Sequence, residues 1–304
     1  MSVALVFPGQ GSQRAGMLGA LSGRPGLVRL FDAAEALSDL DLRSIASDGT
    51  AEQLADTRAA QPLLYLADWA WGSAALQAGV APSAVAGHSL GELAALAVAG
   101  VYSVEAGLEL VIERSRLMAE CANATPGGMA AIIGLDADAI TRVTSYIAGV
   151  WVANDNSPGQ VVISGTLEGV LSAQSALLEA GARRVVQLQV AGPFHTPLMK
   201  PAADAFRDIL EVTSFSDAVY PVYSNTQPTA TTDAGLIRER LSTQMVAPVR
   251  WTETMRALVA GGVDVILEAG PGAVLGGLAK RVDGLRAFAV EQDGIASVLS
   301  QEGV

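Results

Sequence analysis

Short apolar runs that predict strands alternate along the chain with longer periodic segments that predict helices. Residues 3–7 form an apolar run that ends at Pro8-Gly9, and residues 84–86 form a second one. Helical periodicity marks residues 27–38, 51–56, 59–78 and 104–122, and a more uniformly apolar helix runs from Leu90 to about residue 99. Strands that alternate with helices in this way predict a parallel sheet with helices on both faces.

The pattern changes near residue 125. Strands are predicted at residues 129–135, 150–154, 160–164 and 184–190, and helices at 136–147 and 167–180, with a turn from Asn156 to Gly159 between the two central strands. The order βαββαβ is that of the ferredoxin-like unit. We therefore predict an α/β protein with a large domain of residues 1–125 and 192–304, into which a small ferredoxin-like domain of residues 126–191 is inserted.

Composition and charge argue against two functional classes. The 304 residues include 19 basic and 31 acidic side chains, a net charge of −12, whereas a nucleic-acid binder needs a basic surface. The longest uncharged apolar run, 93–104, is shorter than the about 20 residues that span a bilayer. Because the chain opens without a basic leader, we expect a soluble cytoplasmic protein. Two histidines and one cysteine are a poor ligand set, so we expect no metal.

The segment Gly87-His88-Ser89-Leu90-Gly91 fits G-x-S-x-G between a predicted strand and a predicted helix. In that context the glycines allow a sharp turn, and the serine oxygen projects from the edge of the sheet. Ser89 also lies at a helix N-terminus, where free backbone N–H groups favour developing negative charge. The pattern predicts that Ser89 is a nucleophile.

A serine nucleophile needs a base, and only two histidines are available. His88 is adjacent to Ser89, so its side chain should point away and pack beneath the turn. His195 lies on a loop just before Thr196-Pro197, a typical helix start, and is the predicted base. The acidic residues between the serine and His195 that could complete a triad are Asp136, Asp138, Asp155, Glu168 and Glu179, and all fall in the predicted small domain. We therefore predict a dyad in which a backbone carbonyl or an amide orients His195.

Six segments resemble the motifs of malonyl-CoA:acyl carrier protein transacylases. They are FPGQGSQ at residues 7–13, GHSLGE at 87–92, NSPGQVV at 156–162, GPFH at 192–195, QMVAPVRW at 244–251 and EAGPG at 268–272. They occur in family order and extend over nearly the whole chain. The resemblance implies that the large domain is hydrolase-like, and that its inserted domain is ferredoxin-like.

The resemblance also implies roles for individual residues. The backbone carbonyl of Gln244 would hold His195, and Gln10 with the backbone N–H of Leu90 would form the oxyanion hole. A nucleotide-binding loop is the rival interpretation of Gly9-x-Gly11-x-x-Arg14, but that segment lacks the third glycine.

A second set of residues is expected to bind the acyl group and to determine which acyl group is accepted. By the family match Arg114 grips the free carboxylate of a malonyl group, which a planar guanidinium can bind through two parallel hydrogen bonds. Arg116 is two positions further on and faces another side of the helix. Phe194 resembles the malonyl-type pattern, in which a bulky ring leaves no room for a methyl substituent, and Leu90 agrees with that specificity. We also expect His88, Asn154 and Asn156 at the substrate site.

The predicted activity is ping-pong transfer of a malonyl group from malonyl-CoA to the phosphopantetheine thiol of an acyl carrier protein, through a malonyl-serine. CoA is then a substrate and product, no cofactor is permanently bound, and the enzyme is expected to be a monomer. An acidic carrier calls for a local basic rim, for which the candidates are Arg183, Arg184, Lys200, Arg250, Lys280 and Arg281.

Other functions stay open at this stage. A related transacylase could serve malonate decarboxylase, or could act in trans in polyketide synthesis with another acyl group. A thioesterase or esterase on the same scaffold would not need Arg114, and a non-catalytic scaffold subunit would not need an intact site. The sequence leaves the pathway undecided.

Overall fold

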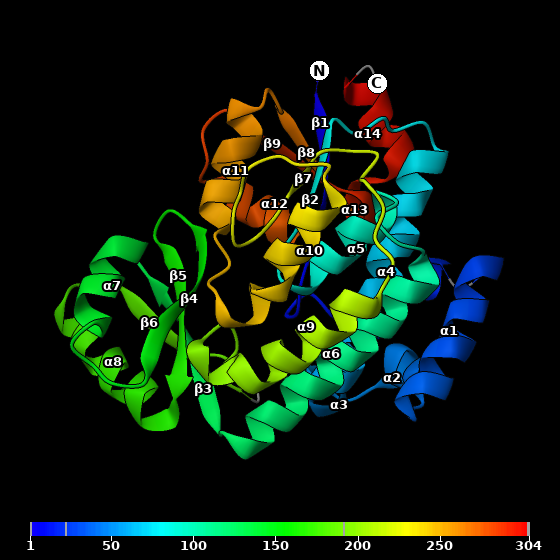
Figure 1. The fold of residues 1–304 in the computed structure, drawn as a ribbon. Coiled ribbons are helices and arrows are strands. Elements are labelled where there is room, and N and C mark those ends of the chain that lie inside the picture. The colour runs from blue at the N-terminus through cyan, green and yellow to red at the C-terminus, as the bar shows by residue number, and fades with distance from the viewer. Residues whose placement is uncertain (1, 22, 191, 303–304) are drawn as a thin grey trace.

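The five residues of strand β1 (Val3–Phe7) are all buried, and they form the middle of a parallel sheet. A computed structural model describes residues 2–21, 23–190 and 192–302. The sheet has the order β7-β2-β1-β8-β9 and adds the strands β2 (Ala84–Gly87), β7 (Val222–Tyr223), β8 (Val265–Glu268) and β9 (Arg286–Ala289). Every neighbouring pair is parallel (Figure 1).

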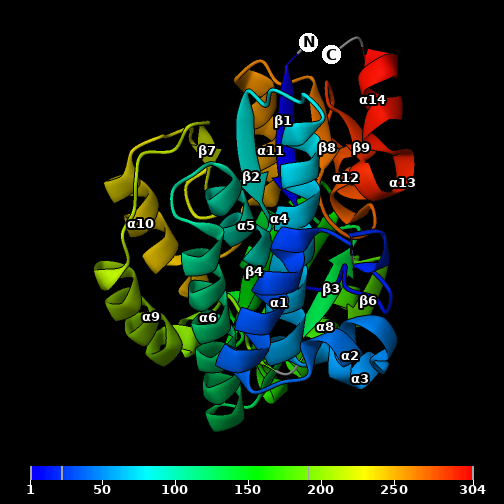
Figure 2. The same cartoon turned by 90° about the vertical axis from the view of Figure 1, so that its right-hand side faces the viewer.

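Alternate residues of β1 supply two separate cores, one on each face of this sheet. Leu5 and Phe7 pack with helices α4 (Thr57–Gln77), α5 (Leu90–Val98) and α6 (Val104–Ala124). Ala4 and Val6 pack with α11 (Trp251–Ala260) and α12 (Val274–Ala279) on the opposite face. Figure 2 shows α4 and α5 in front of the sheet and α11 behind it. The predicted parallel sheet with helices on both faces is confirmed.

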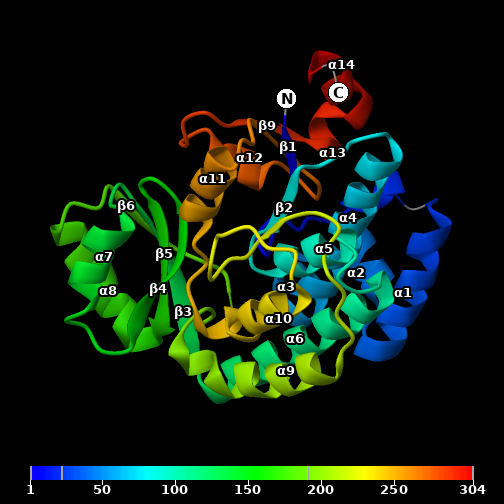
Figure 3. The ribbon, with the colours of Figure 1, turned by 45° about the horizontal axis from the view of Figure 1, so that its top comes forward.

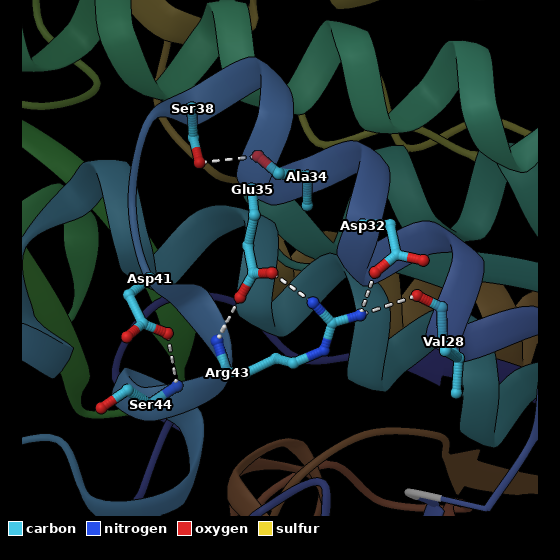
Figure 4. Close-up of polar contacts among 8 residues, drawn as sticks. All are labelled: Val28, Asp32, Ala34, Glu35, Ser38, Asp41, Arg43 and Ser44. Atoms are coloured by element: carbon cyan, nitrogen blue, oxygen red, sulfur yellow. Dashed lines mark hydrogen bonds and ion pairs between the residues drawn. The ribbon is translucent and has the colours of Figure 1, made fainter.

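Helix α2 (Leu42–Asp48) lies between α1 (Pro25–Ser38) and α3 (Ala51–Ala55), in a segment for which the sequence pattern predicted no element. Asp41 caps it by accepting a hydrogen bond from the backbone N–H of Ser44 at 3.0 Å. Arg43 reaches from α2 to α1, where it contacts Asp32 at 2.6 Å, the carboxylate of Glu35 and a backbone carbonyl (Figure 4). These contacts dock the short helix on its longer neighbour.

The remaining elements of the large unit are mostly short. They are η1 (Gly19–Leu21), η2 (Pro197–Met199), α9 (Lys200–Val212), α10 (Ala234–Ser242), η3 (Gln244–Val246), α13 (Val290–Asp293) and α14 (Ile295–Glu302). Helix α9 packs along α6, and α10 packs on α9. Among the described residues no helix is long and apolar enough to cross a membrane.

A second sheet is antiparallel, with the order β4-β5-β3-β6. Its strands are β3 (Gly127–Ile133), β4 (Val150–Ser157), β5 (Gln160–Thr166) and β6 (Arg184–Gln187), and its helices are α7 (Ala137–Thr144) and α8 (Leu167–Glu179). Both helices pack on one face and close a separate core. Figure 3 shows this unit beside the parallel sheet. The connectivity and strand order are ferredoxin-like, as predicted.

Several boundaries in this unit differ from the sequence prediction. The strand expected at 129–135 runs from Gly127 to Ile133, because the two glycines pair with β5 instead of forming a turn. The helix expected to reach residue 147 ends at Thr144, and the strand expected to reach residue 190 ends at Gln187. The turn expected at 156–159 shrinks to two residues, since β4 continues to Ser157 and β5 begins at Gln160. At Gly127-Gly128 and at residues 155–157, glycine and polar residues were wrongly interpreted as lying outside the strands.

Candidate active site

Ser89 occupies a sharp turn between β2 and α5, with φ 52° and ψ −106°. A Cβ atom at Gly91 would lie 2.1 Å from the carbonyl oxygen of Phe7, so only glycine lets α5 approach β1 this closely. The backbone N–H of Ser89 donates to Oδ1 of Asn225 at 2.7 Å, and Nδ2 of Asn225 donates to the carbonyl of Gly87 at 2.5 Å. The predicted elbow is present, and a side chain from a distant segment clamps it.

His195 faces the serine. Its Nε2 lies 2.7 Å from Oγ of Ser89, while its Nδ1 donates to the backbone carbonyl of Gln244 at 3.0 Å and lies 3.3 Å from that of Ala247. Burial, followed by the positive charge of Arg114, lowers the pKa of His195 to about 3. The ring is therefore neutral, with its proton on Nδ1 and the lone pair of Nε2 directed at the serine hydroxyl. Such a pair can take the serine proton without a carboxylate.

Arg114 brings a positive charge to the same oxygen. Its side chain, on α6, is 1 % exposed, and its Nη2 donates to Oγ of Ser89 at 3.2 Å and to Oε1 of Gln244 at 2.8 Å. Its Nη1 donates to Oε1 of Gln61 at 2.6 Å. Burial lowers the pKa of Arg114 to about 10, so the guanidinium stays charged at neutral pH. These three oxygen partners are all neutral, so an anion beside Ser89 would meet a buried cation that has no carboxylate in direct contact with it.

Arg116 does not share this site. Its guanidinium lies on the protein surface, where it pairs with Glu113 at 2.7 Å and Glu120 at 2.8 Å. Positions two apart on a helix face different directions, as the sequence spacing predicted. Of the two arginines, Arg114 alone approaches the serine.

A cavity of about 170 Å³ opens beside Ser89, between the two sheets. The large unit lines it with Gly9, Gln10, His88, Ser89, Leu90, Arg114, Met118, Phe194, His195, Val274, Leu275 and Leu278. The antiparallel sheet and the segment that follows it add Met129, Asn154, Asn156, Gln160, Val162, Leu188 and Val190. The lining is mostly apolar, with a few polar groups at the serine, which is the composition expected of a small-molecule site.

Gln10 and Leu90 border this cavity from two sides. Gln10 follows β1, and its Oε1 accepts a hydrogen bond from Oγ1 of Thr57 at 3.1 Å. With that oxygen engaged, Nε2 is the end of the amide that can donate to a substrate. Leu90 is the first residue of α5, so its backbone N–H belongs to the open first turn of a helix. Both groups are thus donors of the kind that an oxyanion needs.

His88 connects the elbow to the antiparallel sheet. Its Nε2 lies 2.8 Å from Oδ1 of Asn156 and 3.5 Å from Nδ2 of Asn154, and its ring packs edge-on against Trp251. Burial lowers the pKa of His88, so the ring is neutral and donates to Asn156. His88 is itself part of the cavity lining, and its contacts with Asn156 and Trp251 support that wall.

The sequence matches the Acyl transferase domain family over residues 4–298. The chain belongs to this family. Acyl transferase chemistry fits the geometry described above, in which an activated serine, a neutral histidine and two candidate oxyanion donors border one cavity.

Several relatives resemble this acyl transferase over more than nine tenths of its length. The malonyl CoA-acyl carrier protein transacylase of Bacillus subtilis is 42% identical over 286 residues, which cover 92% of this chain and 90% of the relative. The enzyme of the same name from Escherichia coli K12 is 41% identical, with coverage of 95% and 96%.

Solved structures agree with these relatives. A malonyl-transacylase in complex with its type II PKS acyl-carrier protein has a TM-score of 0.92 and 41% identity, covering 99% of this chain and all of that one. The malonyl-CoA:ACP transacylase of Synechocystis sp. PCC 6803 has a TM-score of 0.89 and 38% identity, covering 98% and 100%. The predicted family and fold class are both confirmed.

The six basic residues expected to form a rim have varied surroundings in this acyl transferase. Lys200 pairs with Asp204 at 2.6 Å, and Arg250 pairs with Glu253. Arg281 donates from Nη1 to Oγ of Ser157 at 3.4 Å. Arg184 is the first residue of β6, Arg183 directly precedes it, and Lys280 follows α12. Two of the six charges are therefore offset by neighbouring carboxylates.

The structure adds polar groups that the sequence interpretation missed. Gln61 and the side chain of Gln244 both hold Arg114, Asn225 holds the elbow, and Glu92 is buried beneath it. The sequence could have indicated Glu92, because it is the one charged residue in the apolar helix that follows Ser89. Gln61 and Asn225 lie far apart in sequence and carry no local pattern, and Gln244 was assigned a role only for its backbone carbonyl. Among the described residues no cluster of His, Cys, Asp or Glu could hold a metal ion.

Proposed function

We propose that this acyl transferase moves a malonyl group from malonyl-CoA to the phosphopantetheine thiol of an acyl carrier protein, through a malonyl-serine at Ser89. The observation that carries the proposal is the buried guanidinium of Arg114, 3.2 Å from the serine oxygen and bonded only to neutral oxygens. A neutral acyl group gains nothing from that charge, whereas the carboxylate of a malonyl group gains a charge-assisted, two-pronged contact.

In the first half-reaction Nε2 of His195 accepts the Ser89 proton as Oγ attacks the thioester carbonyl carbon. Nε2 of Gln10 and the backbone N–H of Leu90 stabilise the oxyanion, and each such donor contributes about 3 kcal/mol in other acyl-transfer enzymes. The C–S bond then breaks, and His195 returns the proton to the CoA sulfur. The carrier thiol repeats these steps in reverse order and leaves with the malonyl group, so no permanently bound cofactor is required.

The surroundings of the serine support selectivity for the acyl group. Phe194 lines the cavity and is 5 % exposed, so its ring occupies space that a substituent on the malonyl carbon would need. Asn154 and Asn156 border the opposite wall from the antiparallel sheet. We also propose that residues 126–191 are an inserted domain within a catalytic domain of residues 1–125 and 192–304. Ala191, the last residue of that insert, lies outside the described residues.

The test is intact-protein mass after mixing with malonyl-CoA, acetyl-CoA or methylmalonyl-CoA, with Ser89→Ala as the control. We expect a malonyl adduct that the variant lacks, that the other two donors form poorly, and that holo-acyl carrier protein removes. Free malonate accumulating without transfer to the carrier would instead identify a thioesterase. An adduct with another donor only would show that the proposed acyl group is wrong.

A further inference from the structure

The side-chain amide of Gln244 lies between Arg114 and a buried carboxylate. Its Oε1 accepts from Nη2 of Arg114 at 2.8 Å, and its Nε2 donates to Oε2 of Glu92 at 2.7 Å and to the backbone carbonyl of Ser89 at 3.0 Å. The two ends of an amide are not interchangeable, since one accepts and the other donates. A carboxylate and a carbonyl only accept, so together they fix which end of Gln244 faces the guanidinium.

Glu92 is built into the elbow. It lies in the first turn of α5, is 1 % exposed, and Oε2 also accepts from the backbone N–H of Asn225 at 3.3 Å. Asn225 in turn holds the backbone of Ser89. One buried carboxylate thus contacts both residues that position the chemistry, Gln244 on the side of Arg114 and Asn225 on the side of the serine.

Charge provides a second reason for a carboxylate at this place. Arg114 is buried, and its hydrogen-bond partners Gln61, Gln244 and Ser89 are neutral. A buried cation needs a compensating charge nearby, but a carboxylate in direct contact with the guanidinium would compete with an acidic substrate. Glu92 acts on Arg114 electrostatically while the amide of Gln244 stands between them. This arrangement balances the charge and leaves the guanidinium available.

We propose that Glu92 is a positioning residue that holds Arg114 through Gln244 and thereby sets the preference for acyl groups with a free carboxylate. The inference rests on the proposed function, because it assumes that Arg114 receives the malonyl carboxylate. Glu92 does not contact the acyl group. Without that charge, the Ser89 carbonyl alone holds the NH₂ group of Gln244, so Gln244 and Arg114 are held less firmly in the arrangement that binds an anion.

The test compares Ser89 acylation by malonyl-CoA and by acetyl-CoA in Glu92→Gln, which removes the charge and keeps the volume. We expect kcat/KM for malonyl-CoA to fall about tenfold or more, mainly through a higher KM, while that for acetyl-CoA changes less than about twofold. Glu268→Gln is the matched control, since Glu268 is equally buried but accepts from the backbone N–H groups of Leu275 and Gly276. The control should lower stability without changing the malonyl-to-acetyl ratio.

A second variant, Gln244→Met, removes the amide and keeps the backbone carbonyl that receives His195. It should lower the malonyl-to-acetyl ratio as Glu92→Gln does, and the double variant should be no worse than either single one. Equal losses for both donors in Glu92→Gln, an unchanged ratio, or additive losses in the double variant would overturn the proposal. If the wild-type enzyme itself forms no malonyl-serine, the proposed function is wrong, and that outcome is distinct from an unchanged ratio in an active enzyme.

Discussion

The pH dependence of Ser89 acylation tests whether His195 acts as the base. Burial and the charge of Arg114 lower the pKa of His195 to about 3. The imidazole should therefore stay neutral, and able to accept the serine proton, across the range in which an ordinary histidine becomes protonated. We expect the rate of acylation to be nearly flat from about pH 8 down to about pH 5.

The size of the effect follows from the two pKa values. At pH 5 a histidine with an ordinary pKa near 6.5 is about 3% neutral, whereas one with a pKa of about 3 is about 99% neutral. An ordinary base would therefore lose about 25-fold in rate between pH 7 and pH 5, and His195 should lose almost nothing.

The assay is rapid-quench mass spectrometry of the acyl-enzyme at subsaturating malonyl-CoA, with Ser89→Ala as the blank. Acid also destabilises the folded chain. Below about pH 6.5, the ordinary pKa of histidine, the unfolded chain protonates this residue and the folded chain does not. The free energy of unfolding therefore falls as the pH drops from about 6.5 toward 3. Circular dichroism at each pH separates unfolding from loss of the base. An inflection in kcat/KM between pH 6 and 7 in folded enzyme would refute the assignment.

Two further predictions concern stability. Both oxygens of the buried Asp68 carboxyl lack hydrogen-bond partners among the described residues, and burial, then the charge of Glu268, raises its pKa well above the usual range. The folded chain therefore keeps a proton on Asp68 that the unfolded chain releases above about pH 4. Between that pH and the folded-state pKa, the free energy of unfolding of the wild type should fall by about 1.4 kcal/mol per pH unit relative to that of Asp68→Asn. Urea unfolding of both proteins at several pH values measures this difference. If the free energy of unfolding of the two proteins changed with pH in the same way, the prediction would be contradicted. Gly91→Ala should lose about 3 kcal/mol, because its Cβ would meet the carbonyl of Phe7 at 2.1 Å, whereas Gly277→Ala, with open space around it, should be neutral or slightly stabilising in the same assay.

The sequence predicted those parts of the fold that depend on local pattern. Apolar runs such as Val3–Phe7 are buried on both faces of a parallel sheet, and the change of pattern after residue 125 identified the ferredoxin-like unit. The G-x-S-x-G motif located the elbow, and the scarcity of histidines led to His195. In the structure that histidine lies 2.7 Å from Ser89.

The side chains that organise Arg114 could not be predicted in the same way. Gln61 lies inside α4, where periodicity alone does not reveal which polar residue faces a partner on α6. Gln244 was assigned a role only for its backbone, and its side chain joins residues that are 130 and 152 positions away. Contacts over such separations depend on how the helices pack, and no local pattern encodes that. Helix α2 escaped prediction for a simpler reason, since seven residues give less than two turns of periodicity.

The backbone angles at Ser89 and His195 affect which substitutions the chain can accept during evolution. Among the described residues three that are not glycine have positive φ, namely Asp39, Ser89 and His195. Conformations of this kind cost about 1–3 kcal/mol each, and glycine would relieve most of that. Selection for folding alone would therefore tend to erase both members of the proposed dyad. If both side chains act in catalysis, glycine at either position would gain stability and lose activity, which is the trade-off expected of a strained active site.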